Sequence, residues 1–367
     1  MRLTLRDEPS ALICDDGRHV HVKACCSRRL FLGGLAAVGA GALSAGRPAH
    51  AQAPAAVRPF RIDVHHHLSS PGFIAEIAGR RTGQTPLMRW TAAKSIDDMD
   101  QAGVATSILS ISEPGVFFGN YDAARALARE CNDFGAKTIM DHPGRFGMFA
   151  ILPLPDVDGS LREIAYALDT LKADGICMMT DYQGKFLGDA AFTPVMEELN
   201  RRKAIVFTHP YRNDCCRGLV PDVTDNVLEL GADTGRTIAS LLFSGTAAKF
   251  PDIQWIFSHA GGTAPSYMQR FNTYFDARKD LQERLPLGPA HYMQKFFYDT
   301  ANANTIYPLA ALARLVKPSQ ILFGTDYPFG PPKTVVANLN ALDLFGPNEL
   351  LAIERDNAAR IMPRLGK

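Results

Sequence analysis

The stretch Arg61-Ile62-Asp63-Val64-His65-His66-His67 joins a short apolar strand to three consecutive histidines. Side chains of an extended chain alternate between two faces, so Asp63, His65 and His67 point to one face and His66 to the other. Two imidazoles on one strand face can bind a single metal ion. Histidine-rich tracts also occur where no metal binds, so the rest of the chain has to decide between these interpretations.

The composition of the chain is that of an ordinary globular protein, with 367 residues, 46% hydrophobic and 21% charged. The first 51 residues carry seven Lys or Arg and four Asp or Glu, and without them 32 positive side chains face 34 negative ones. A surface this close to neutral has no basic stripe for phosphates. We therefore expect no nucleic-acid partner.

The N-terminal segment has the features of an export signal. Ser27-Arg28-Arg29-Leu30-Phe31-Leu32 precedes a small, apolar run at 33–45 and then Ala49-His50-Ala51, which has the form of a signal-peptidase site. The run is short of the ~20 strongly apolar residues of a stable membrane span. We predict a twin-arginine signal at 1–51, a short segment at 52–59 and one domain at 60–367. The resemblance to such signals implies a bacterial protein exported after folding, periplasmic or secreted and without a stable membrane anchor; a disordered tail and an uncleaved anchor are the alternatives.

Four cysteines remain after that segment, and they show no CxxC pair or disulfide framework. Cys131 and Cys177 lie in apolar surroundings and are expected in the core. Cys215 and Cys216 are interpreted as an exposed thiol pair or as partners in a disulfide with another site. Neighbouring side chains diverge, so a shared metal site is not expected there.

From residue 60 onward, strand-like and helix-like stretches alternate, which predicts parallel strands joined by helical crossovers. Helical spacing is found between the strands, for example at Gly235–Lys249 and Ala264–Leu285. Eight such units in about 300 residues favour a closed (β/α)₈ TIM barrel, in one α/β domain, over an open sheet. The expected strands are Arg61–His66, Val104–Ile111, Phe146–Leu152, Gly175–Thr180, Ala204–His209, Ile253–His259, Phe296–Thr300 and Ile321–Asp326.

Barrel enzymes carry their chemistry at the C-terminal ends of the strands, and polar residues gather at four of these ends. The first expected strand ends in His65 and His67, the fifth in His209, the sixth in His259 and the eighth in Asp326. A single histidine at a strand end is more often a hydrogen-bonded core residue. Four strands that end in this way favour a functional site.

Four motifs carry a family resemblance: Asp63-Val64-His65-His66-His67, Thr208-His209-Pro210, Ser258-His259-Ala260-Gly261-Gly262 and Gly324-Thr325-Asp326-Tyr327-Pro328-Phe329. They resemble the amidohydrolase superfamily, in the branch that contains α-amino-β-carboxymuconate-ε-semialdehyde, γ-resorcylate and 6-methylsalicylate decarboxylases. The resemblance covers about residues 60–362. It is specific for the branch and not for a substrate.

The resemblance implies that His65, His67, His209 and Asp326 bind one divalent metal ion and that His259 handles the proton of a metal-bound water or of the substrate. Three imidazoles and a carboxylate suit Zn²⁺, which we expect, or Mn²⁺. No organic cofactor is expected. Asp63 is expected to orient an imidazole, and His66 is interpreted as structural. The fourth expected strand lacks the lysine that bridges two metals in binuclear members, which favours a single ion.

Two arginines are candidates for binding the substrate carboxylate. Arg270 matches a position at which the resembled decarboxylase supplies an arginine from the neighbouring subunit, so the resemblance also implies a homodimer. Arg89 lies in the long connection after the first strand, which departs from the family pattern. A solvated surface charge is the alternative for each of them.

The leading prediction is a metal-dependent, non-oxidative decarboxylase of a small hydroxyaromatic, salicylate-like acid or a related unsaturated acid. It delivers a proton to the carbon that bears the carboxylate and releases CO₂. The alternative is a hydrolase of a lactone, amide or carbon–carbon bond that uses metal-bound hydroxide. A metal-carrying protein without turnover is a third interpretation, but a carrier has no need of a proton-handling residue such as His259.

Overall fold

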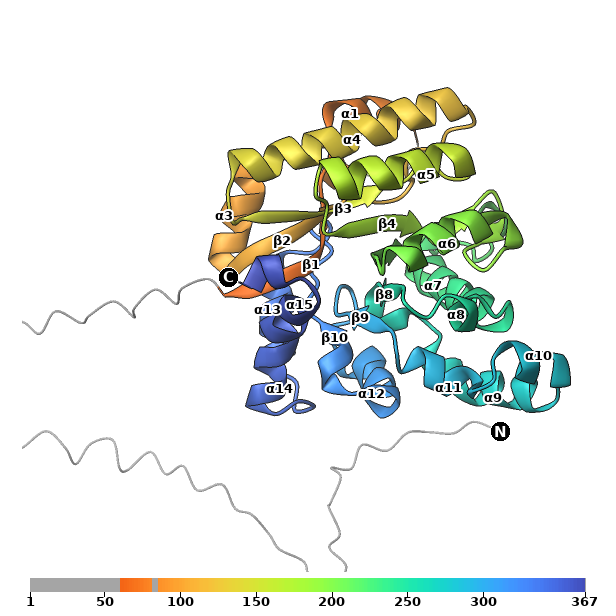
Figure 1. The fold of residues 1–367 in the computed structure, drawn as a ribbon. Coiled ribbons are helices and arrows are strands. Elements are labelled where there is room, and N and C mark those ends of the chain that lie inside the picture. Colours follow the sequence, from red (N-terminus) through yellow and green to blue (C-terminus); the bar gives the residue numbers. More distant parts are fainter. Residues whose placement is uncertain (1–59, 81–84, 367) are drawn as a thin grey trace, which may run out of the picture. The chain divides into compact units, whose positions relative to one another are not determined.

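A computed structural model describes residues 60–80 and 85–366, so the predicted export signal and the segment at 52–59 lie outside the described residues. Eight parallel strands form one sheet in chain order (Figure 1). The strands are β1 (Arg61–His67), β2 (Val104–Ser110), β3 (Phe146–Ile151), β4 (Gly175–Met179), β7 (Ile205–His209), β8 (Gln254–Phe257), β9 (Phe297–Asp299) and β10 (Ile321–Leu322).

The sheet closes between its first strand and the segment that follows its last. The Val64 amide donates to the Phe323 carbonyl oxygen at 2.9 Å, and the Asp326 amide donates to the His65 carbonyl oxygen at 2.9 Å. His67 and Tyr327 continue the same contact with a bond of 2.8 Å. The predicted (β/α)₈ barrel is therefore confirmed, and its closure places Asp326 beside the histidines of β1.

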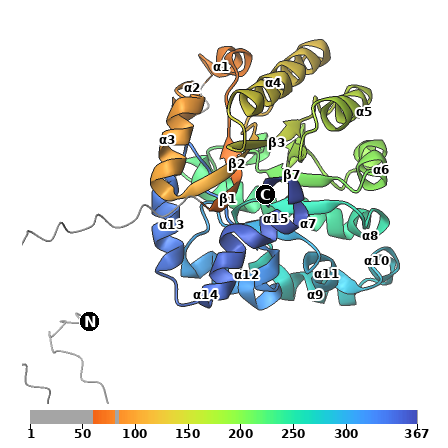
Figure 2. The same ribbon diagram turned by 60° about the vertical axis from the view of Figure 1, so that its left-hand side comes forward.

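Helices surround the strands, as the view in Figure 2 shows. They are α1 (Pro71–Ile77), α2 (Thr85–Met88), α3 (Ala92–Ala102), α4 (Tyr121–Asp141), α5 (Val157–Ala165), α6 (Thr193–Arg201), α7 (Asp225–Phe243), α8 (Thr246–Lys249), α9 (Met268–Asp276), α10 (Lys279–Arg284), α11 (Gly288–Met293), α12 (Ile306–Leu315), α13 (Pro332–Asn340), α14 (Pro347–Leu351) and α15 (Asn357–Ile361). None of the helices in the described part of the chain is long and apolar enough to cross a membrane.

Two expected helices are divided in the structure. The stretch at 235–249 contains the end of α7, which begins earlier than expected, and all of α8. Gly245 separates them with a φ of +83°, a left-handed conformation that glycine adopts without steric cost. The stretch at 264–285 forms a 3₁₀ turn (Pro265–Tyr267), α9 and α10, while the hairpin of β5 (Asp181–Tyr182) and β6 (Lys185–Phe186) was not expected.

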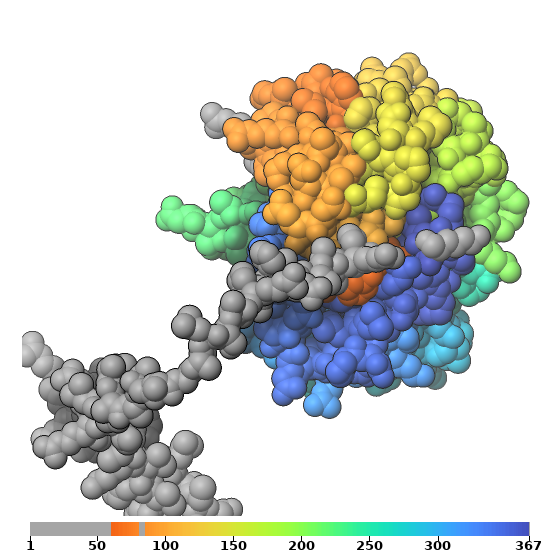
Figure 3. All heavy atoms as spheres, turned by 90° about the vertical axis from the view of Figure 1, so that its left-hand side faces the viewer, coloured from red at the N-terminus to blue at the C-terminus, as the bar shows by residue number. Residues whose placement is uncertain are grey.

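A helix near the start of the barrel packs against a helix near its end. Helix α13 contacts α3, and Figure 3 shows these blue and orange segments side by side. Inside the barrel, the rings of Phe149 and Phe207 stack with centroids 5.4 Å apart, and Phe207 contacts His65 edge-on at 5.0 Å. Buried aromatic rings therefore pack against His65.

Candidate metal centre

Four side chains converge at the C-terminal ends of the strands. One nitrogen or oxygen each from His65, His67, His209 and Asp326 lie within 4.8 Å of one another. Nε2 of His65 is 3.2 Å from Nε2 of His67 and 3.1 Å from Oδ1 of Asp326. All four residues are buried, with at most 4% of their surface exposed. The structure thus brings together the whole set of predicted ligands.

Each of the three imidazoles has a partner at Nδ1. Nδ1 of His65 lies 2.7 Å from Asp299 Oδ2, that of His67 lies 3.3 Å from the Ser110 carbonyl oxygen, and that of His209 lies 2.9 Å from the Pro210 carbonyl oxygen. A carboxylate or carbonyl at Nδ1 keeps the ring proton there. The Nε2 lone pairs therefore face the centre of the cluster, as a divalent metal site requires of its histidine ligands.

The electrostatics of the cluster favour positive charge at its centre. Burial lowers the pKa of His67, and burial with the charges of His67 and His65 holds the pKa of His209 well below its usual value. Burial also opposes charge on His65, but Asp299 and Asp326 outweigh it and raise that pKa to about 10. Burial would raise the pKa of Asp326, yet the charge of His65 holds it well below its usual range. Two negative carboxylates thus attract positive charge to the centre.

The backbone around Asp326 is adapted to this position. Asp326 has a φ of +61° and Asn302, which donates to its Oδ2, has a φ of +49°. Non-glycine residues in this left-handed region cost about 1–3 kcal/mol each and concentrate at functional sites. A side chain at Gly324 would meet Cβ of His65 at 2.9 Å and Cβ of Asp299 at 3.0 Å. Only glycine allows these three segments to approach so closely.

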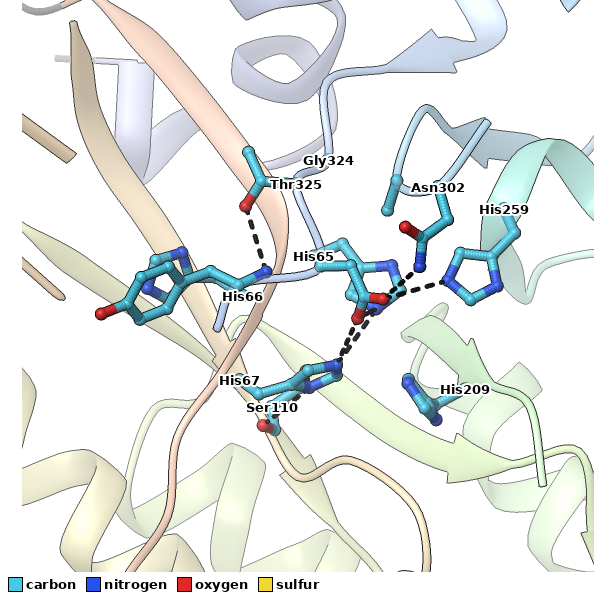
Figure 4. A network of polar contacts seen from close by, with 12 residues as sticks. His65, His66, His67, Ser110, His209, His259, Asn302, Gly324 and Thr325 are labelled. Atoms are coloured by element: carbon cyan, nitrogen blue, oxygen red, sulfur yellow. Dashed lines mark hydrogen bonds and ion pairs between the residues drawn. The ribbon is translucent and has the colours of Figure 1, made fainter. Parts of the chain in front are cut away.

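His259 faces the cluster from the turn after β8 (Figure 4). Its ring stacks on His65 with centroids 5.1 Å apart, and its Nε2 lies 3.7 Å from Asp326 Oδ2, which is longer than a hydrogen bond. This Nε2 is buried and has no hydrogen-bond partner within the described residues. A side chain at Gly262 would lie 2.2 Å from the Gly231 carbonyl oxygen, so the His-Ala-Gly-Gly motif needs its glycine here.

His66 points away from the cluster, as Figure 4 shows. It lies 3.0 Å from Asp63 Oδ2 and 2.6 Å from Ser95 Oγ and stacks on Tyr327, which agrees with the structural role predicted for it. Asp63 does bind an imidazole, but that of His66. It also accepts hydrogen bonds from the Thr325 amide and hydroxyl, and therefore joins β1 to the closing segment.

The pocket beside the cluster has a volume of about 290 Å³. Its wall contains His209, His259, Asn302 and Asp326 together with Ser112, Glu113, Arg212, Thr224, Asn226, Leu230 and Phe329. The two predicted substrate arginines are not part of this wall. Arg89 is exposed after α2, and Arg270 is exposed on α9, where it lines a separate surface hollow with Tyr267 and Tyr274.

Sequence reasoning missed Asp299, Asn302 and the pair of Glu113 and Arg212. Asp299 ends β9 directly after two aromatic residues, so the rule that located the other strand ends applies to it as well. Its role depends on contacts with His65 of β1 and with the His259 amide after β8, which the path of β9 through the sheet brings about. Cys131 and Cys177 are buried as expected, while Cys215 and Cys216 form a disulfide with each other in the loop after β7.

A parallel (β/α)₈ barrel with a three-histidine, one-aspartate cluster at its C-terminal face defines a class of metal-dependent enzymes. The family model described as amidohydrolase matches residues 62–364, and the chain belongs to that family.

Several relatives of the chain are decarboxylases. It is 35% identical over 326 residues to a decarboxylase of Aspergillus niger, which covers 83% of this chain and 88% of the relative. It is 35% identical over 324 residues to a 6-methylsalicylic acid decarboxylase of Aspergillus aculeatus, covering 83% and 96% of the two chains. Among solved structures, an amidohydrolase is similar with a TM-score of 0.77 and 27% identity, covering 83% of this chain and 99% of that one. A dihydroxybenzoic acid decarboxylase from Polaromonas with bound manganese has the same fold, with a TM-score of 0.72, 21% identity and coverage of 83% and 97%.

Proposed function

We propose that the protein is a metal-dependent, non-oxidative decarboxylase of a small hydroxyaromatic acid of the salicylate type. The observation that carries the proposal is the place of His259, whose buried Nε2 faces the metal ligands from the wall of the pocket. About 290 Å³ is at the small end of the range of ligand pockets and suits one substituted ring. Curated relatives with 33–35% identity are named as 6-methylsalicylic acid decarboxylases, and this supports the substrate class.

The residues of the pocket have different roles in the proposed decarboxylation. A divalent cation held by the four ligands supplies positive charge that attracts the oxygen atoms of the acid. His259 delivers a proton to the ring carbon that bears the carboxylate, and the carbon–carbon bond then breaks so that its electron pair restores the aromatic ring and CO₂ leaves. Phe329 and Leu230 provide apolar wall for the ring. Asn302 holds Asp326 in place through its amide.

For the metal we propose Zn²⁺, with Mn²⁺ as the alternative. Three neutral imidazoles and a carboxylate are a common zinc set, and the manganese in the Polaromonas structure supports the alternative. Purification without added metal, followed by elemental analysis, separates the two ions.

We also propose a homodimer in which Arg270 extends toward the partner's pocket. Arg270 lies on an exposed face of α9 with Tyr267 and Tyr274, which are 47% and 49% exposed. Tyrosine and arginine are enriched in protein interfaces. Light scattering of the purified protein tests the dimer, and Arg270→Glu is expected to shift it toward the monomer.

Export by the twin-arginine route remains a proposal that rests on Arg28 and Arg29. Fractionation of cells that express the full chain tests it. The protein is expected in the periplasm or medium, and Arg28→Lys/Arg29→Lys should retain it in the cytoplasm.

The function is tested by incubating metal-loaded protein with salicylate, 6-methylsalicylate and dihydroxybenzoates while CO₂ is measured. We expect CO₂ and the corresponding phenol from at least one of these acids. His259→Asn should keep the metal and reduce kcat by about 10²–10⁴-fold, the usual contribution of a general acid. Ring-opened or hydrolysed products without CO₂ would favour the hydrolase, and full activity of His259→Asn would contradict the role of His259.

A further inference from the structure

A salicylate-type acid carries a negative charge, and a positive side chain in the pocket would strengthen its binding beyond what the metal supplies. Among the residues that line the metal pocket, all in the described part of the chain, Arg212 is the one arginine or lysine. It follows the metal ligand His209 by three residues, in the loop after β7. The path of the chain therefore brings a guanidinium and a metal ligand to the same wall.

Arg212 is held in place by a carboxylate of a distant segment. Its Nε lies 2.9 and 2.8 Å from the two oxygens of Glu113, and its backbone amide donates to Glu113 Oε1 at 3.1 Å. The side chains of Arg212 and Glu113 are only 17% and 5% exposed. Glu113 follows β2, so the pair joins the connections after β2 and β7 across the pocket. The guanidinium is oriented before any substrate arrives, which reduces the entropy lost on binding.

A guanidinium suits a carboxylate because its N–H groups form charge-assisted hydrogen bonds in a planar fork. Such a bond is stronger in a pocket screened from water than on an open surface. Arg217 provides the contrast. It lies in the same loop and pairs with Asp214, but it is 42% exposed and does not line the metal pocket.

We propose that Arg212 binds the carboxylate of the acid substrate and that Glu113 positions Arg212 for this contact. The inference rests on the proposed function, because it presumes a carboxylate in the pocket. The contact is present before CO₂ is lost. It disappears when the carboxylate becomes neutral CO₂, because the electron pair of the broken bond stays with the ring. Removing Arg212 should therefore raise KM more than it lowers kcat.

The direct test is the binding of salicylate to the metal-loaded protein, measured by calorimetry and compared with 2-hydroxybenzyl alcohol. The alcohol keeps the ring and the hydroxyl group but has no carboxylate. Arg212→Gln is expected to weaken salicylate binding by about 10–100-fold, as loss of a charge-assisted bond does. Binding of the alcohol should stay near that of the wild type, and Arg217→Gln should bind both compounds as the wild type does.

Arg212→Gln leaves Glu113 buried without its partner, which can destabilise the fold. The variant Glu113→Gln/Arg212→Gln removes both charges and avoids this problem. It should melt near the wild type and show the same selective loss of salicylate binding. Glu113→Gln alone should weaken salicylate binding less than Arg212→Gln does, and Arg212→Lys should recover part of the affinity.

Equal losses of affinity for salicylate and the alcohol, or unchanged salicylate affinity in the folded double variant, would overturn the proposal. The pair of Glu113 and Arg212 would then be a structural ion pair between two loops. The binding assay needs no turnover. If the wild type releases no CO₂ from any acid, the proposed function is wrong. The role of Arg212 in binding the carboxylate is still tested separately, by the comparison of salicylate with the alcohol.

Discussion

Replacing Asp299 by asparagine tests how the fold prepares a metal ligand. Asp299 is fully buried and uses its two oxygens differently. Oδ1 accepts hydrogen bonds from the amides of His259 and Ala301 at 2.8 and 3.0 Å, while Oδ2 lies 2.7 Å from Nδ1 of His65. The asparagine oxygen has to take the Oδ1 position to satisfy two N–H donors. Its NH₂ group then faces His65 Nδ1 and requires a lone pair there.

This replacement shifts the ring proton of His65 from Nδ1 to Nε2, the nitrogen that binds the metal. Loss of such a hydrogen-bond partner costs about 10–100-fold in metal affinity, and the wrong tautomer places the expected loss at the upper end of that range. Competition of the variant with a chelator of known affinity measures the change. Circular dichroism and melting of the metal-free protein show whether the fold is kept.

Asp63→Asn is a matched control. Asp63 on β1 is equally buried, but among ring nitrogens it contacts only that of His66. Its replacement should leave metal affinity close to that of the wild type. Wild-type metal affinity in Asp299→Asn, or an equal loss of affinity in both variants, would contradict this role of Asp299.

Three other changes have expected outcomes. His66→Gln should still bind one metal ion per chain by elemental analysis, because His66 contacts Asp63 and Ser95 and no ligand; loss of metal would contradict this. Burial raises the pKa of Asp233 to about 7, so its carboxyl stays protonated in the folded protein at pH values where the unfolded chain has already released the proton. The free energy of unfolding therefore falls as pH rises from about 4 to 7. Asp233→Asn should remove this pH-dependent decrease and raise the free energy of unfolding at pH 8, measured with urea, by an amount on the order of 2–4 kcal/mol. An unchanged pH profile of stability would contradict this expectation. Dialysis against a chelator should abolish CO₂ release, and Zn²⁺ or Mn²⁺ should restore it; activity that survives complete metal removal would exclude a metal-dependent reaction.

The ligands could be predicted because one positional rule governs them. Parallel strands of a barrel end at one face, so the location of a polar residue directly after an apolar strand follows from its place in the chain. His65, His209 and Asp326 follow this rule. Asp299 follows it too, but an acid is common enough at a strand end that the sequence alone does not single it out.

The contacts between loops could not be predicted. Glu113 and Arg212 are 99 residues apart, and their contact depends on how two connections cross the pocket. In the same way, Asp63 binds the imidazole of His66 because the closing segment around Thr325 brings its own donors to this carboxylate. Periodicity determines which face a side chain occupies, but it does not determine the partner found there.

We propose that this pocket protonates the carbon that bears the carboxylate and releases CO₂. Incubation of the metal-loaded protein with 6-methylsalicylate in D₂O follows both the proton and the CO₂. We expect one CO₂ per molecule of 3-methylphenol, with a single deuterium on the ring carbon between the hydroxyl and methyl groups. Consumption of the acid without CO₂, or 3-methylphenol without deuterium at that carbon, would contradict it.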